Sequence, residues 1–260
     1  MGIFDSGVGG LTVLAEAARL LPSVRFHYFA DSGFAPYGEK PRDEILSRCL
    51  AITEDMIHQG AAAILVACNT ATSSAIEDMR RRFPLPIVGM EPALKPAVEA
   101  GLPGPILVLG TAFTIREPKY QRLLRRFQNT KNIVSLPCPG LVNLIEAGHR
   151  NDSLLKDHLR QLLKDHLARD YSAIVLGCTH FVYLKDPLRS LFGDAVQFFD
   201  GNRGTARQLT KILQERGLLA DNIVPAPNSQ DHITFATSGD KNHVLPLCQI
   251  LLTDLMKTND

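Results

Sequence analysis

Two cysteine-centred motifs carry the chemistry that this sequence could support. ACNTA spans residues 67–71 and GCTH spans residues 177–180, and each directly follows a short apolar run. The motifs lie near the middle of the two halves of the chain, so Cys68 and Cys178 occupy similar places in two similar halves. Such a pair of thiols suits the movement of a proton onto or off either face of one carbon atom.

A cysteine acts as a base only as the thiolate, whose formation requires that its pKa of about 8.5 be lowered by a helix N-terminus or a positive neighbour. Residues 70–83 have a helical pattern that begins just after Cys68, and we expect a similar turn after Cys178. The free N–H groups of a first helical turn favour a thiolate or a bound carboxylate. His180 could serve Cys178 as a proton partner. A lone cysteine that ends a buried strand is ordinarily core packing, whereas two of them beside Thr and Asn or His favour chemistry.

Residues 4–10 (FDSGVGG) form a glycine-rich motif near the start of the chain. The pattern predicts a strand that ends in a glycine-rich loop and opens a helix, which is typical of an anion-binding cradle. It is not the dinucleotide-binding fingerprint, because the third glycine of that pattern is missing. Asp5 could orient a base or hold an ammonium group, or it could cap the following helix.

Residues 35–40 (APYGEK) form a turn after the second expected strand. Tyr37 and the Gly38 backbone could close on a small polar ligand. The same residues could equally form an ordinary surface turn, because proline and glycine are common turn formers.

The elements that must position these motifs follow an α/β pattern. The apolar runs are short and alternate with helical patterns, as in proteins built on parallel sheets. Strands are expected to begin near eight residues, four in each half at a nearly constant offset: Gly2, Val24, Ala62, Pro86, Pro105, Asn132, Ser172 and Val196. In open parallel sheets ligands bind beyond the carboxyl ends of strands, and each motif described above lies at such an end.

Two amphipathic segments account for two further cysteines. Residues 43–59 and 241–256 place apolar side chains at helical spacing, and Cys49 and Cys248 lie on these apolar stripes. We therefore expect both thiols in the core. Cys138 lies in a turn-rich stretch and is assigned no role.

The chain is expected to form two domains. The turn-rich residues 100–105 (AGLPGP) separate its halves, and a loop at residues 201–204 (GNRG) is expected to end the second half. We assign residues 1–92 plus 205–260 to a first, discontinuous α/β domain and residues 93–204 to a second.

The composition excludes several classes of function. The hydrophobic fraction of 45% and the charged fraction of 21% are those of a globular protein rather than a disordered one. A net charge of +1 gives no electrostatic reason to expect nucleic acid or an anionic membrane as partner. No apolar run approaches the roughly 20 residues of a membrane helix. Five cysteines without paired spacing argue against a disulfide framework and for a cytoplasmic protein. No HExxH, paired CxxC or P-loop is present, so we expect no metal.

Along nearly its whole length, the chain resembles the glutamate racemases, within the cofactor-independent aspartate/glutamate racemases. The matching stretches, in order, are FDSGVGGLTVL, PYGEK, ACNTA, GMEPALKPA, GTAFT, CPGLVNLIEAG, GCTH, TAR at residues 205–207 and TSGD at residues 237–240. The resemblance implies two pseudo-symmetric, flavodoxin-like α/β domains with parallel sheets and an active site in the cleft between them. It also implies interconversion of L- and D-glutamate with no cofactor, which supplies D-glutamate for peptidoglycan in the bacterial cytoplasm. Glutamate is the expected partner, and a homodimer stays open.

By position, the resemblance implies that Cys68 and Cys178 are the two acid/base residues, the first acting on D-glutamate and the second on L-glutamate. Asp5 would support Cys68, and His180 with Glu146 would support Cys178. The positions expected to line the substrate are Asp5, Ser6, Tyr37, Gly38, Asn69, Thr70, Thr179 and His180, with Thr111 and Thr114 as further contacts.

Three other functions stay open on the sequence. The chain could racemise another amino acid, such as aspartate, because the pocket that measures side-chain length is not visible in a sequence. It could bind a small anion without chemistry, and loss of the α-hydrogen signal from glutamate in heavy water would separate these cases. A thiol–disulfide oxidoreductase would ordinarily need a CxxC pair, which is absent, and a reductase assay tests it.

Overall fold

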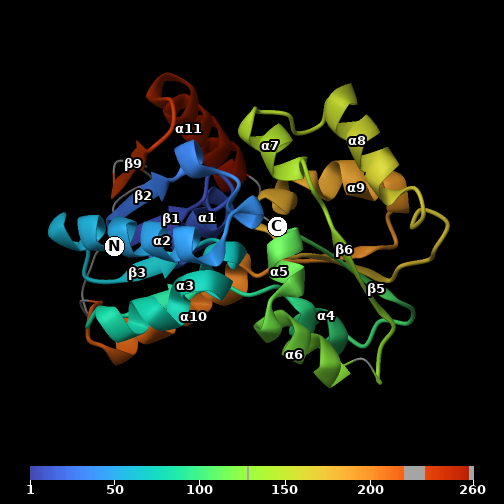
Figure 1. The fold of residues 1–260 in the computed structure, drawn as a ribbon, viewed down its shortest axis with the longest axis horizontal. Helices are drawn as coiled ribbons and strands as arrows, with labels where there is room; N and C mark the ends of the chain where they lie inside the picture. The colour runs from blue at the N-terminus through green and yellow to red at the C-terminus, as the bar shows by residue number, and fades with distance from the viewer. Residues whose placement is uncertain (128, 220–231, 258–260) are drawn as a thin grey trace. The chain divides into compact units, whose positions relative to one another are not determined.

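The computed structural model describes residues 1–127, 129–219 and 232–257. The chain divides into two units, Met1–Met90 with Asn202–Asp260, and Glu91–Gly201. These limits differ by two or three residues from those expected from the sequence. Each unit is a parallel β-sheet with helices, which is the α/β fold class predicted (Figure 1).

The first unit contains a five-stranded parallel sheet with the order β4-β3-β1-β2-β9. Its strands are β1 Gly2–Asp5, β2 Phe26–Ala30, β3 Ile64–Val66, β4 Ile87–Gly89 and β9 Ile233–Thr237. The first four begin within two residues of the predicted positions. The fifth strand, β9, was not predicted, although the return of the chain to this unit was.

Helices cover both faces of this sheet (Figure 1). They are α1 Leu11–Leu20, α2 Arg42–His58, α3 Asn69–Arg82, α10 Asn202–Glu215 and α11 Lys241–Lys257. Helix α2 packs against α3, and α1 packs against both α10 and α11. Cys49 on α2 and Cys248 on α11 are fully buried in the core, as predicted. Two short 3-10 turns, η1 Ser32–Phe34 and η2 Tyr37–Glu39, follow β2.

The predicted loop at residues 201–204 is largely wrong, because α10 begins at Asn202. The two glycines of this stretch suggested a loop. The helix nevertheless forms because Ala206, Leu209 and Leu213 are buried on one of its faces and α10 packs against α1. Tertiary packing of this face outweighs the poor helix propensity of glycine.

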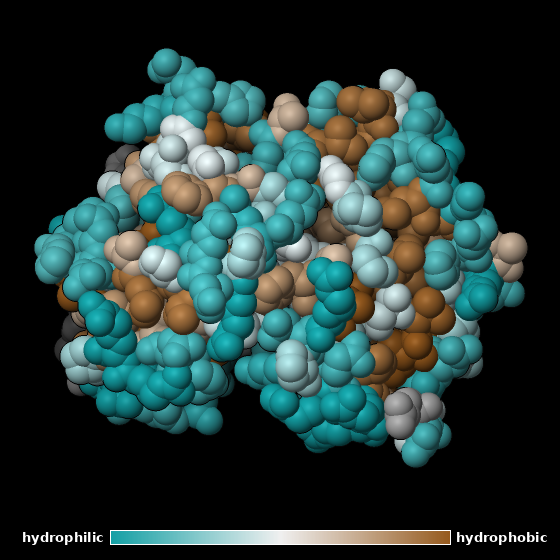
Figure 2. Space-filling model, in the orientation of Figure 1, coloured by the Kyte–Doolittle hydropathy of each residue, from teal (hydrophilic) through white to brown (hydrophobic). Residues whose placement is uncertain are grey.

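The second unit contains a four-stranded parallel sheet with the order β6-β5-β7-β8. Its strands are β5 Ile106–Gly110, β6 Ile133–Pro137, β7 Ala173–Leu176 and β8 Gln197–Phe199, and its helices are α4 Leu94–Glu99, α5 Ala112–Arg116, α6 Pro118–Phe127, α7 Leu141–Glu146, α8 Ser153–Leu163 and α9 Lys185–Phe192. All four strands begin within one residue of the predicted positions. On the face shown in Figure 2, apolar residues reach the surface over β6, whose residues are only partly buried.

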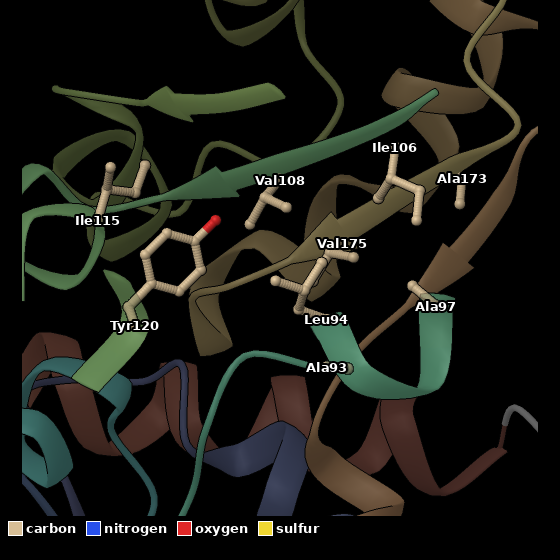
Figure 3. Close-up of a cluster of buried hydrophobic side chains, with 9 residues drawn as sticks. All are labelled: Ala93, Leu94, Ala97, Ile106, Val108, Ile115, Tyr120, Ala173 and Val175. Carbon is tan, nitrogen blue, oxygen red and sulfur yellow. The ribbon is translucent and has the colours of Figure 1, made fainter. Parts of the chain in front are cut away.

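Residues 100–105 do not separate the two units. They connect α4 to β5 inside the second unit, because α4 already packs on that unit's sheet. Leu94 and Ala97 of α4 share a buried cluster with Ile106 of β5 and Val175 of β7 (Figure 3). The boundary therefore precedes α4, as the assigned domain limits implied. Within the described residues, none of the helices is both long and apolar enough to cross a membrane.

Gly10 permits the close approach of α1 to the ends of β1 and β3. A Cβ atom on Gly10 would lie 2.7 Å from the Asp5 Cβ, 2.9 Å from the Tyr28 hydroxyl and 3.0 Å from the Ala67 Cβ. We expect Gly10→Ala to lower the free energy of unfolding by about 1–3 kcal/mol, because these buried neighbours have no room to retreat. Urea denaturation of both proteins measures the difference. Gly60→Ala would be a poor control because Gly60 has a positive φ, so Gly204→Ala, which meets nothing within 4 Å, serves instead.

Candidate active site

The carboxyl ends of the strands in the first unit bring four polar side chains into one row. Strand register pairs β1 with both β2 and β3, and β2 with β9. Continued past the last paired residues, it aligns Cys68, Ser6, Asp31 and Ser238. Parallel strands present their carboxyl ends at one edge of the sheet, where open α/β folds bind ligands.

Cys68 is the N-cap residue of α3. Its backbone is extended, and its Sγ accepts a hydrogen bond from the Ala71 amide at 3.4 Å. An N-cap sulfur faces the positive end of the helix, which stabilises a thiolate relative to a thiol. The helix expected after Cys68 therefore begins at Asn69, where its N-terminus can stabilise a thiolate at Cys68.

Ser6 links Cys68 to Asp5. The Cys68 Sγ lies 3.8 Å from the Ser6 Oγ, and the Ser6 hydroxyl donates a hydrogen bond to the Asp5 Oδ1 at 3.0 Å. All three side chains are buried. Ser6 thus connects the two residues: its hydroxyl donates to Asp5, and its oxygen accepts from the Cys68 thiol.

Asn69 follows Cys68 and is the first residue of α3. Its side chain is buried, and neither its Oδ1 nor its Nδ2 has a hydrogen-bond partner among the described residues. A buried amide without partners is costly, so such a group beside a functional thiol points to a polar ligand. Thr70, the next residue, is also buried at this helix start.

Tyr37 and Gly38 form part of η2, which packs against α3. The structure therefore places these two residues against the helix that Cys68 caps. The Tyr37 side chain itself is buried, and its hydroxyl donates to the Asp31 Oδ2 at 2.5 Å. The backbone of the loop, rather than the phenol, is thus the part that remains for a ligand.

Asp31 was not singled out from the sequence. A signal was present, because a D-S-G triplet occurs at the carboxyl end of both of the first two strands: residues 5–7 begin with the last residue of β1, and residues 31–33 directly follow β2. Asp31 is fully buried and continues the same row as Ser6.

The second unit has its own thiol at the corresponding strand end. Cys178 follows β7, and register across β5 aligns it with Thr111 and Cys138. The Cys178 Sγ lies 3.8 Å from the His180 Nδ1, and the His180 Nε2 lies 2.5 Å from the Glu146 Oε1. The three expected residues therefore form one connected group.

His180 is the positive neighbour of Cys178. Burial alone would lower the pKa of His180, but its hydrogen bonds to Cys178 and Glu146, together with the charges of both, raise that pKa well above its ordinary value. The imidazolium form is therefore favoured at neutral pH, with one N–H directed at the sulfur and the other at the carboxylate. A cation beside a thiol favours its thiolate.

The turn expected after Cys178 differs from the helix start after Cys68. Cys178 is followed by a 3-10 stretch, η3 Thr179–Leu184, before α9 begins, and its side chain makes no capping hydrogen bond. Thr179 is buried at the start of this stretch. The two thiols are therefore polarised differently, Cys68 by a helix N-terminus and Cys178 by an imidazolium.

Thr111 is the N-cap residue of α5, and Thr114 lies in the first turn of that helix. The Thr114 amide donates to the Thr111 Oγ1 at 3.1 Å, and the two hydroxyl groups are 3.0 Å apart. Nearby, burial raises the pKa of Cys138 to about 12, with the charge of Cys178 adding to the effect. Cys138 therefore stays protonated, in line with the absence of an assigned role.

No group of three or more histidine, cysteine or acidic side chains in the described part of the chain could hold a metal ion. The groups that the structure assembles for chemistry are thiols, hydroxyls, an imidazole and carboxylates. These are groups for proton transfer.

The fold and these two thiol sites define an α/β protein of two similar parallel-sheet units, each with a polarised cysteine after the third strand of its half. The chain belongs to the Asp/Glu/Hydantoin racemase family, whose model matches residues 10–209. It is therefore an isomerase of the racemase class.

Similar proteins agree with this assignment. The chain is 43% identical over 253 residues to a glutamate racemase of Ectopseudomonas mendocina, covering 97% of this chain and 94% of the relative. It is 46% identical to a glutamate racemase of Pseudomonas syringae pv. tomato, covering 85% and 80%. The Escherichia coli glutamate racemase, solved with L-glutamate and the activator UDP-MurNAc-ala, has a TM-score of 0.83 at 30% identity, covering 96% of this chain and 94% of that one.

Proposed function

We propose that this chain interconverts L- and D-glutamate, with Cys68 and Cys178 as the two acid/base residues acting on opposite faces of the α-carbon. The observation that carries the proposal is the pair of thiols at corresponding strand ends, each with its own polarising group. Glutamate as the substrate is supported by the relatives, among them a racemase solved with L-glutamate.

The proposed reaction moves one proton off the substrate and one onto it. With D-glutamate, the Cys68 thiolate removes the α-proton and the Cys178 thiol returns a proton to the opposite face, which leaves Cys68 as thiol and Cys178 as thiolate. With L-glutamate the roles are exchanged. The α3 N-terminus favours the thiolate of Cys68, and the His180 imidazolium favours that of Cys178.

The carbanion is the costly species along this path. Donors fixed around the substrate carboxylate would stabilise its charge as it develops. Asn69 is suited to this work because its buried amide has no partner among the described residues. Ser6, Thr70 and Thr179 offer hydroxyl groups at the same strand ends.

Thermodynamics adds one constraint. The two enantiomers have equal free energy in water, so the equilibrium constant is one and the reaction needs only a lower barrier. It follows that kcat/KM has the same value in both directions for the wild-type protein and for every variant. A variant can show asymmetry only in kcat, in KM or in exchange of the α-hydrogen with solvent.

The experiment that tests the proposal is turnover of each pure enantiomer in heavy water. We expect each molecule of glutamate that changes configuration to carry one deuterium at the α-carbon, measured by proton NMR, and the mixture to end at equal amounts. Aspartate in place of glutamate tests the alternative substrate. Binding of glutamate with no loss of α-hydrogen would overturn the proposal and favour a binding protein.

We also propose that the product supplies peptidoglycan synthesis in the cytoplasm. None of the five cysteines, all of which the structure describes, forms a disulfide, which suits a reducing compartment. Depletion of this protein in its own cells should stop growth, and added D-glutamate should restore it. Light scattering of the purified protein tests the homodimer.

A further inference from the structure

Asp31 lies at the centre of a buried hydrogen-bond cluster beside the candidate site. Its Oδ1 accepts from the Ser238 hydroxyl at 2.6 Å and from the Arg48 Nη2 at 2.7 Å. Its Oδ2 accepts from the Arg48 Nε at 2.8 Å and from the Tyr37 hydroxyl at 2.5 Å. A fully buried carboxylate is tolerated only when charge and hydrogen bonds compensate it, and the two-point contact with arginine does so.

The partners of Asp31 come from three different segments, and one of them, Ser238, is 207 positions away in the sequence. Arg48 belongs to α2, Tyr37 to η2, and Ser238 to the turn between β9 and α11. The Arg48 guanidinium also lies over the Phe34 ring, 4.2 Å from its centroid. The single carboxylate thereby ties a strand end, a helix and two turns together.

The close fit of this cluster extends to the backbone. The Gly33 amide donates to the Ser238 Oγ at 3.1 Å, and a Cβ on Gly33 would come within 2.6 Å of the Ser238 carbonyl oxygen. The turn after β2 and the turn after β9 are therefore in direct contact, and a larger side chain at residue 33 would separate them.

The Tyr37 phenol is committed to Asp31. Burial, with the charges of Cys49 and Asp31, raises the pKa of Tyr37, so its hydroxyl stays protonated and remains a donor. The bond to Asp31 turns the ring inward and leaves the Tyr37–Gly38 backbone beside α3. The side chain expected to close on a ligand thus acts as an anchor for the loop.

We propose that Asp31 is the positioning residue of the loop at residues 36–40, and that its bond to Tyr37 holds the loop backbone where the substrate binds. The proposal rests on the proposed function only in taking this loop to contact glutamate. Without the anchor, the binding-competent loop is one of several conformations, and substrate binding must supply the free energy that selects it.

The expected effect is a rise in KM larger than any fall in kcat. If the competent loop is populated about a tenth of the time in Asp31→Asn, KM for both enantiomers rises about tenfold. Tyr37→Phe removes only the loop's bond and keeps the Asp31–Arg48 pair, so it should show the same effect at smaller size. The double variant should have the same KM as Asp31→Asn alone, because both substitutions remove the same Tyr37–Asp31 interaction.

A matched control separates positioning from a loss of stability. Thr53 lies on α2 near Arg48, is fully buried, and donates from its hydroxyl to the Cys49 carbonyl oxygen at 2.8 Å. Thr53→Val removes a buried hydrogen bond from the same helix without touching the Asp31 cluster. It should lower stability and leave KM unchanged.

The test combines steady-state kinetics with amide hydrogen exchange read by mass spectrometry on the peptide that contains residues 36–40. We expect faster exchange of this peptide in Asp31→Asn and Tyr37→Phe, and wild-type exchange in Thr53→Val. Should Asp31→Asn not fold, Tyr37→Phe carries the test, because it keeps the buried ion pair. Exchange and KM in Tyr37→Phe that match Thr53→Val would overturn the proposal.

The two proposals fail separately. Absence of racemisation by the wild-type protein overturns the proposed function, whereas hydrogen exchange reports the anchoring of the loop whether or not glutamate reacts. Wild-type racemisation with no change in loop exchange on removal of the Tyr37 hydroxyl overturns the positioning role alone.

Discussion

Cys68→Ala is expected to reduce the racemisation of glutamate by roughly a thousandfold or more in both directions, because one of the two proton-transfer groups is lost. The same variant should still exchange the α-hydrogen of L-glutamate with solvent. Cys178 keeps its imidazolium neighbour and can remove the L-enantiomer's α-proton, then return a solvent-derived proton to the same face. D-Glutamate should not exchange. Polarimetry measures the first effect, and proton NMR in heavy water measures the second.

Cys178→Ala should give the mirror result, with exchange confined to D-glutamate. Cys49→Ala is the matched control, because Cys49 is another fully buried thiol of the same unit as Cys68 and burial raises its pKa. It should racemise glutamate as the wild-type protein does. Racemisation by Cys68→Ala at the wild-type rate, or exchange of both enantiomers by that variant, would show that Cys68 is not the base for D-glutamate.

Most strands were predictable because each is a short apolar run bounded by turn residues. All eight expected strands begin within two residues of their predicted positions. Strand β9, residues Ile233–Thr237, is as long as β2 and was missed because its two threonines interrupt the apolar run. It pairs in parallel with β2, which lies about two hundred residues earlier in the sequence. A local sequence pattern does not specify so distant a partner.

The site residues likewise differ in whether local sequence or distant contacts define them. The local sequence was enough to predict the helix start after Cys68, because a helix N-cap is determined by neighbouring residues. The resemblance, rather than any local pattern, linked His180 with Glu146, whose side chains meet across 34 positions. The role of Asp31 depends on its burial and on its contacts with Arg48 and Ser238. Neither can be predicted from residue types alone.

Tyr37 shows how a correct location can conceal a different role. The sequence placed it in a loop near the site, and an exposed phenol there would contact a ligand. The structure buries the ring and directs the hydroxyl to Asp31. The difference arises because the acceptor, Asp31, is held buried by Arg48 and Ser238, and these contacts cannot be predicted from the residues of the turn itself.

The second large effect is expected from Glu146→Gln, because Glu146 keeps His180 protonated. With the carboxylate charge removed, burial lowers the pKa of His180 and only the contact with Cys178 opposes it. The imidazolium should then lose its proton at a lower pH, and Cys178 loses the cation that favours its thiolate. We expect kcat/KM at pH 8 to fall by about ten- to a hundredfold. The alkaline limb of its pH profile should move to lower pH.

Three measurements make this prediction specific. The fall in kcat/KM must be equal in the two directions, since the equilibrium constant is one, whereas α-hydrogen exchange should slow more for L-glutamate, whose base is Cys178. The pH dependence of the unfolding free energy gives an independent test. A raised pKa of His180 stabilises the folded state fully below the unfolded value of about 6.5, and this contribution is lost as the pH rises through the folded value. The difference in unfolding free energy between wild type and Glu146→Gln should therefore be largest in acid and shrink in base.

Asp152→Asn provides the matched control for a lost carboxylate beside a histidine. Asp152 lies in the same unit as Glu146 and is hydrogen-bonded to His149 at 2.6 Å, but this pair is exposed to solvent and has no assigned role. The variant should keep the wild-type pH profile. If Glu146→Gln also kept the alkaline limb unchanged, the charge on His180 would not govern the basicity of Cys178. The second thiol would then depend on the backbone N–H groups of η3, in the way we propose for Cys68 and α3.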